Sequence, residues 1–114
     1  MEEIEKLKKT FSGLKGHRSR HRTRFDKNLQ YSDIKRTEQL KIALLEQNDK
    51  VISHLEKMGE ADQGESLQAA VSKELAEAMA IDEDVNETFV MYCQRINESL
   101  AQSNQKSGED TYGE

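Results

Sequence analysis

The 114-residue sequence contains no proline, no tryptophan, a single cysteine and few aromatic residues, which make up 5% of the chain. Without proline, nothing forces a helix to kink or stop. Cys93 has no second cysteine to pair with, so an internal disulfide is excluded, which suits a reducing compartment. No apolar run approaches the length that crosses a bilayer, and the opening MEEIEK matches neither a signal peptide nor a myristoylation signal. We therefore expect an intracellular location, cytoplasmic or nuclear.

The residues that are present favour long, slender helices. Hydrophobic and charged residues each make up 34% of the chain, too apolar for full disorder and too polar for a thick core. Apolar residues recur in steps of three and four, never in strand alternation, over residues 2–31, 33–58 and 66–103. We predict an all-α bundle over residues 1–102, either an antiparallel three-helix bundle or a coiled-coil-like hairpin with a third helix. Residues 103–114 have little apolar content, which predicts a disordered tail.

Several residues indicate where these helices begin, end or weaken. The stretch Tyr31-Ser32-Asp33 offers an N-cap for the second helix, and Gly59 fits a C-cap at its other end. Gly13 and Gly16 destabilise the first helix, and they mark either a break or a close approach to a neighbour. The acidic run of residues 82–84 would let the third helix fray or bend.

Charge is distributed unevenly. Residues 1–57 carry a formal charge of +5, whereas residues 58–114 carry −10. The cations are densest in residues 15–27, KGHRSRHRTRFDK, which contain Lys15, Arg18, Arg20, Arg22, Arg24 and Lys27. The two halves therefore attract each other, and each could also attract an external partner.

The apolar stripe of the first helix is interrupted at two positions, Arg18 and His21. In an up-down-up bundle these lie level with the middle of the second helix, near Asn48, and of the third, near the acidic run. We therefore predict a polar layer that fixes the register of the helices. Its members are Arg18, His21, Asn48, Asp82 and Glu83.

The basic stretch has two interpretations, and the sequence leaves both open. Its cations pair with the acids of the third helix, or those that cannot reach that helix bind phosphates. Aromatic residues for base stacking are missing, since Phe25 belongs to the apolar stripe, so RNA binding would be independent of sequence.

No catalytic or metal site is visible in the sequence. His17 and His21 have the spacing of two metal ligands on a helix, but the four arginines beside them repel a cation and no third ligand is in view. Cys93 has no positioned base that would make it a nucleophile. We predict that the protein is not an enzyme, that it holds no metal or cofactor, and that it takes no small-molecule substrate.

Three blocks of the sequence resemble the N-terminal helical region of Gag-like polyproteins from Pao/BEL-type retrotransposons. They are LKGHRSRHRTRFDKNL (residues 14–29), LKIALLEQNDKVISHLEKM (residues 40–58) and IDEDVNETFVMYCQRINESL (residues 81–100), the last with an acidic run followed by Phe89 and Tyr92. The resemblance implies a structural role in particle assembly, with RNA contact, and brings no catalytic residues.

Two functions follow as hypotheses. In the first, the chain is a helical assembly module that binds itself or another helical protein, as a Gag-like segment of a retroelement or a domesticated copy. In the second, the basic helix binds RNA or another polyanion and the remainder of the chain positions it.

Overall fold

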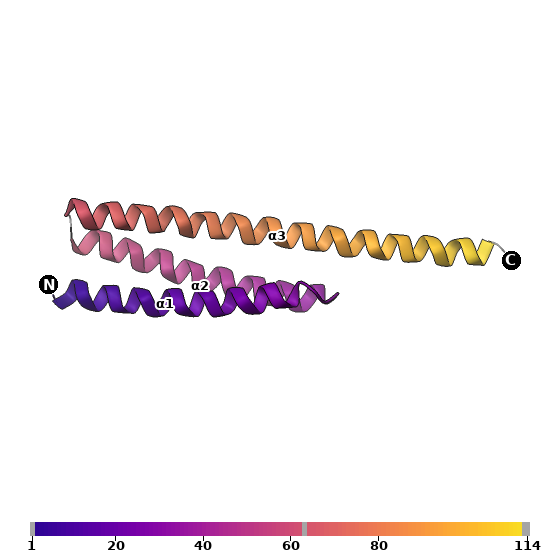
Figure 1. Cartoon of the computed structure of the whole chain (residues 1–114), viewed down its shortest axis with the longest axis horizontal. Coiled ribbons are helices and arrows are strands. Elements are labelled where there is room, and N and C mark those ends of the chain that lie inside the picture. Colours follow the sequence, from indigo (N-terminus) through magenta and orange to yellow (C-terminus); the bar gives the residue numbers. More distant parts are fainter. Residues whose placement is uncertain (1, 63, 113–114) are drawn as a thin grey trace.

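The computed structural model describes residues 2–62 and 64–112, with the side chains of residues 3–62 and 64–102. Three helices, α1 (Glu2–Asn28), α2 (Ile34–Ala61) and α3 (Glu65–Tyr112), follow one another up, down and up (Figure 1). The described ranges contain no strand. The prediction of an all-α, antiparallel three-helix bundle is therefore confirmed.

A tight turn joins α1 to α2. Helix α1 ends at Asn28, three residues before its predicted end, because the amides of Leu29, Gln30 and Tyr31 each donate to the carbonyl three residues back. This i to i+3 pattern winds the chain more tightly than an α-helix. Of the three residues predicted to offer the N-cap of α2, Asp33 is the cap, since its carboxylate accepts a hydrogen bond from the amide of Arg36 at 3.0 Å.

Helix α2 ends later than predicted, at Ala61, so Gly59 lies inside the last turn of the helix and does not terminate it. The amide group of Gln68 on α3 donates to the carbonyls of Gly59, at 2.6 Å, and Asp62, at 2.7 Å. Carbonyls at a helix C-terminus lack partners within the helix. The α3 side chain supplies these partners and ties the second connection together.

Helices α1 and α3 are both continuous where the sequence suggested a weakness. Helix α1 passes Gly13 and Gly16 unbroken, and neither glycine has a positive φ. Helix α3 passes the acidic run of residues 82–84 and continues to Tyr112, beyond the predicted end at residue 103. The predicted tail of residues 103–114 falls where side chains lie outside the described part of the structure.

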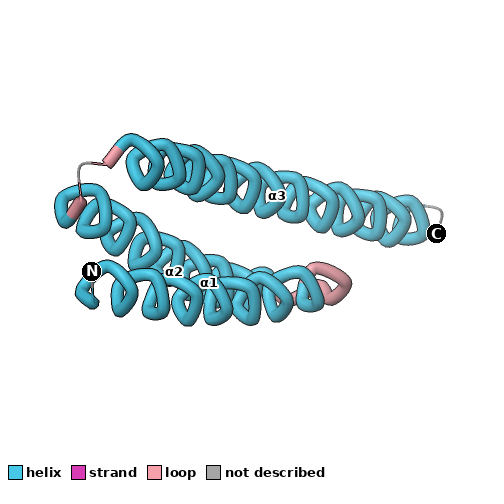
Figure 2. Tube along the Cα trace, turned by 60° about the vertical axis from the view of Figure 1, so that its left-hand side comes forward, coloured by secondary structure: helices cyan, strands magenta, loops and turns pink. Residues whose placement is uncertain are grey.

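The molecule is long and narrow, 78 × 20 × 14 Å. At 1.5 Å per residue the 48 residues of α3 span about 72 Å, so α3 extends well past the α1–α2 turn (Figure 1). Helices α1 and α3 each pack along α2 (Figure 2). In the described ranges, α1 and α3 touch each other only through side chains.

The core consists of two apolar clusters. The first contains Val51, Leu55, Met58 and Val71 and lies toward the α2–α3 connection. The second contains Phe25, Leu44 and Val85 and lies toward the α1–α2 turn. Between them the core is polar, and this is where the candidate site begins.

Candidate functional site

A hydrogen-bonded polar layer crosses all three helices between the two apolar clusters. The guanidinium of Arg18 donates to the Asn48 carbonyl oxygen (Oδ1) at 2.8 Å. The Asn48 amide nitrogen (Nδ2) donates in turn to the Asp82 carboxylate and to the backbone carbonyl of Ala78, both at 2.8 Å. Asn48 is fully buried, and Arg18 is 8% exposed. The structure thus brings Arg18, Asn48 and Asp82 together, one residue from each helix.

The layer is electrostatically balanced. Burial lowers the pKa of the Arg18 guanidinium, and the nearby carboxylates of Glu74 and Glu77 oppose that shift. Arginine nevertheless stays charged in proteins. In the described residues, every buried side-chain nitrogen or oxygen has a hydrogen-bond partner. Removing any one member would therefore leave a buried polar group unpaired, which is more costly than an apolar layer of the same shape.

Two residues predicted for this layer lie outside it. The imidazole of His21 (Nδ1) lies 2.8 Å from the carbonyl oxygen of His17, one turn back on its own helix, and forms no hydrogen bond to Asn48 or Asp82. Glu83 is exposed, because one residue along a helix turns the side chain by about 100° away from Asp82. The prediction was wrong for these two residues.

Half of the basic stretch is directed inward. Lys15 (Nζ) forms an ion pair with Glu74 of α3 at 3.2 Å, and Arg22 (Nη2) with Asp84 of α3 at 2.7 Å. Arg22 also contacts Asp26 on its own helix at 3.1 Å. Burial lowers the pKa of Arg22, but its hydrogen bonds with Asp84 and Asp26 outweigh burial and raise the pKa above its ordinary value. Lys15, Arg18 and Arg22, predicted to contact nucleic acid, thus lie in contacts within the chain.

The other half of the basic stretch is directed outward. Arg20, Arg24 and Lys27 are all exposed. Arg20 lies 2.8 Å from the ring nitrogen (Nδ1) of His17, and the side chains of Arg24 and Lys27 make no hydrogen bond or ion pair with any described residue. These three cations are available to a partner.

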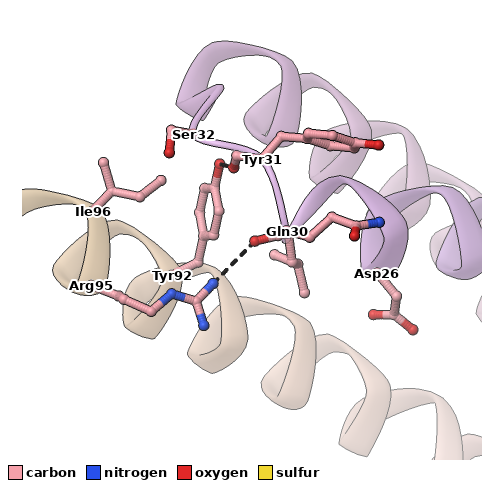
Figure 3. A pocket seen from close by; sticks show the side chains of 8 residues that line it. Asp26, Gln30, Tyr31, Ser32, Tyr92, Arg95 and Ile96 are labelled. Carbon is pink, nitrogen blue, oxygen red and sulfur yellow. Dashed lines mark hydrogen bonds between the residues drawn. The ribbon is translucent and has the colours of Figure 1, made fainter. Parts of the chain in front are cut away.

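A second polar cluster, not anticipated from the sequence, holds the α1–α2 turn against α3. Asn28 donates to the Thr37 hydroxyl at 2.6 Å, and that hydroxyl donates to the carbonyl of Asp33 at 2.8 Å. The Tyr92 hydroxyl lies 3.2 Å from the Thr37 hydroxyl and donates to the carbonyl of Tyr31. Figure 3 shows the Tyr92 ring rising from α3 toward the turn. The residues of this cluster that the sequence singled out were Asp33, in the cap, and Tyr92, in the aromatic pair with Phe89. That they lie close together could not be predicted, because it depends on the length of each helix.

An open surface cavity of about 410 Å³ lies beside this cluster. Arg95 borders it and donates to the carbonyl of Leu29 at 3.0 Å (Figure 3), while its guanidinium lies 5.8 Å from the centre of the Tyr92 ring. Among the polar side chains that line the cavity, Asp26, Tyr92 and Arg95 already have hydrogen-bond partners within the chain. The arrangement fastens the turn and presents no nucleophile paired with a base.

His54 and Cys93 are the remaining titratable residues that the sequence singled out, and neither forms a catalytic or metal site with its neighbours. The His54 ring nitrogen (Nε2) lies 2.6 Å from the carbonyl oxygen of Leu7, and its ring stacks on Phe11 with centroids 6.5 Å apart. Cys93 is half-buried with a free thiol. Across the described ranges, no group of three His, Cys, Asp or Glu side chains is arranged to hold a metal ion. Nor does any helix in those ranges have the length and apolarity that a membrane span requires.

Comparison with known proteins adds no relative. No protein-family model, curated protein or solved structure matches the chain. The resemblance to Pao/BEL-type Gag polyproteins therefore stays a prediction.

Proposed function

We propose that this chain is a non-enzymatic helical assembly module that binds further helices, chiefly in copies of itself. The observation that carries the proposal is the surface of α3. Four large apolar side chains on this helix, Met79, Val90, Met91 and Leu100, are between 53% and 68% exposed. No other described helix covers them, and α3 continues past the end of the α1–α2 pair.

The geometry supports this proposal in two ways. Water contact with these apolar side chains is unfavourable, and a neighbouring helix that covers them would recover about 25 cal/mol for each Å² of apolar surface buried. The part of α3 beyond the α1–α2 turn has no helix beside it, and an isolated helical segment of this length is marginal in water. Association would stabilise both features.

The polar layer has a supporting role in this proposal. A single hydrogen-bonded set of Arg18, Asn48 and Asp82 is satisfied in only one axial alignment of the three helices. If one helix shifted by a turn along its neighbours, the buried Arg18 guanidinium would lose its hydrogen-bond partner. We infer that the layer fixes register within the chain, so that the outer faces are presented in a constant geometry.

Sequence-independent binding of RNA or another polyanion is the second candidate, and one observation favours it. Arg20, Arg24 and Lys27 form an exposed cationic group that the acids of α3 do not neutralise. Three contacts predict weak and strongly salt-dependent binding. A Gag-like role in an intracellular particle would combine the two candidates, and it stays part of the proposal.

Light scattering of the full chain, with and without a mixed-sequence RNA and at two salt concentrations, tests the proposal. The assembly function predicts a mass above that of the monomer without RNA, rising with protein concentration. A mass that stays monomeric without RNA and rises only when RNA is added at low salt would instead assign polyanion binding.

A further inference from the structure

The outward side of α1 is a continuous stripe of cations and glycines. Counting along the helix in steps of three and four from Lys6 passes through exposed positions, apart from the half-buried Gly16, and meets no acid before residue 27. The stripe, called here the basic stripe, consists of Lys6, Lys9, Gly13, Gly16, Arg20, Arg24 and Lys27.

The two glycines of the basic stripe have no role within the chain. Neither glycine has a positive φ, the backbone conformation in which a residue with a side chain would be strained. A Cβ atom on Gly13 would meet nothing within 4 Å, and one on Gly16 would meet only the guanidinium of Arg20, at 3.9 Å. Glycine weakens a helix interior relative to alanine, and on a helix surface its benefit is the close approach of another backbone. The glycines therefore indicate a neighbour outside the chain.

The outward side of α3 is complementary in charge. Stepping by three and four from Ala76 gives a second stripe in which every residue is exposed and none is cationic. We call it the acidic stripe, and it consists of Ala76, Ala80, Glu83, Glu87, Met91, Gln94 and Glu98. Its three glutamates form no hydrogen bond or ion pair with any described residue. The exposed side chains of Met79 and Val90 flank it.

We propose that the basic stripe of one copy binds the acidic stripe of a second copy of this chain. This rests on the proposed assembly function and identifies the surfaces that carry it. In both stripes two small residues are followed by charged ones, and the first charge after the small residues comes seven positions after the first of them, from Gly13 to Arg20 and from Ala76 to Glu83. When α1 and the neighbouring α3 run parallel with Gly13 opposite Ala76, the small residues face small residues, Arg20 faces Glu83 and Arg24 faces Glu87.

The two stripes lie on different helices, each opposite the side that packs on α2. An interface between two unlike surfaces is heterologous, so each bound copy keeps one free stripe and the assembly grows as an open chain or closes into a ring. A polyanion would bind the basic stripe but leave the acidic stripe and its flanking Met79 and Val90 without a role. A second copy uses both stripes.

Charge reversal tests this interface. One variant carries Arg20→Glu, Arg24→Glu and Lys27→Glu, which makes residues 20–27 of the basic stripe acidic, like the stripe that they face. The other carries Glu83→Lys, Glu87→Lys and Glu98→Lys, which makes both stripes basic. We expect each variant alone to associate at least tenfold more weakly than the parent, because equal charges then face each other, and an equimolar mixture to regain association. Circular dichroism establishes that each variant remains helical.

The outcomes separate the interface from the assembly function. If the parent associates but neither charge reversal changes its association, the stripes are not the interface while the assembly function stands. If the parent is monomeric, the assembly function itself fails. In a third outcome, charge reversal leaves association unchanged, but the variant with Arg20→Glu, Arg24→Glu and Lys27→Glu no longer binds RNA. That result would assign the basic stripe to RNA and overturn the proposal.

A glycine pair provides a matched test without any change of charge. Gly13→Ala with Gly16→Ala should raise the midpoint of thermal unfolding by about 4 °C or more, because the positions are open in the folded chain. Gly13→Leu with Gly16→Leu should keep the helical fold but weaken association at least tenfold, since bulky side chains would hold the neighbouring helix away. A leucine variant that associates as tightly as the parent would contradict the close approach.

Discussion

The two sides of α1 carry the same kinds of cation in opposite surroundings. Toward α2 and α3, Arg18 is buried against Asn48, and Arg22 is bound between Asp26 and Asp84. On the outer side, Arg24 and Lys27 have no partner among the described residues. An inner cation is held by specific hydrogen bonds and so determines structure, whereas an outer cation leaves the fold unaffected and can serve binding. Composition alone does not distinguish the two.

The largest effect is expected at the centre of the inner side. Replacing Asn48→Leu would leave the buried Arg18 guanidinium without its acceptor and the Ala78 carbonyl without its side-chain donor. We expect a loss of about 3 kcal/mol in the free energy of unfolding, measured by urea denaturation at a fixed protein concentration.

A matched triple variant, Arg18→Leu with Asn48→Leu and Asp82→Leu, should recover most of that loss, because it removes the whole layer and leaves no partner stranded. Its register should become less unique, visible as broadened or doubled amide resonances. Equal stability of the single and triple variants would contradict the interdependence of these residues.

A smaller effect is expected at the α1–α2 turn. Tyr92→Phe removes the hydroxyl that donates to the Tyr31 carbonyl and lies beside Thr37. We expect a loss of about 1 kcal/mol, the usual net value of one hydrogen bond, by thermal or urea unfolding. Hydrogen exchange should also rise at residues 29–33, while exchange near Val51 stays as in the parent. Faster exchange spread evenly over all three helices would argue against a local clamp.

The ion pairs between α1 and α3 should contribute less. Lys15 and Glu74 are both partly exposed, with side chains 39% and 25% accessible, so solvent screens their attraction. Lys15→Gln should cost about 0.5 kcal/mol or less, and less still in 1 M salt. A loss that is unchanged by salt would show that Lys15 acts through another contact, such as its position over the Phe11 ring.

The sequence predicts most of this fold, because helical stripes depend on local spacing. The three helices and a cap within residues 31–33 follow from periodicity and capping, and counting from the helix ends places Arg18, Asn48 and Asp82 at one level. The burial of Gln47 and His54 is not visible in that spacing, since it depends on how α2 is rotated against its neighbours.

The Tyr92 cluster and the division of the basic stretch needed the structure for a related reason. Tyr92 reaches the turn only because α1 ends at Asn28 and α3 runs straight past it. The charge pattern predicts attraction between α1 and α3, but residues 18, 20, 22 and 24 alternate around the helix. Which of them faces α3 is set by the rotation of α1, and this rotation is fixed by packing.

The smallest effect on stability is expected on the outer side, where Arg20→Gln, Arg24→Gln and Lys27→Gln should change the free energy of unfolding by less than about 0.5 kcal/mol in total. Their effect should fall on association instead. If RNA is bound, each lost contact should also reduce the slope of log affinity against log salt by about one.

Sedimentation equilibrium tests the division between the two sides of α1 most directly. The samples, at equal concentrations and low salt, are the parent, this outer triple Gln variant and an inner variant with Lys15→Gln and Arg22→Gln. The account predicts that the parent and the inner variant associate, whereas the outer variant sediments close to the 13.1 kDa of a monomer. Equal association of the inner and outer variants would contradict it.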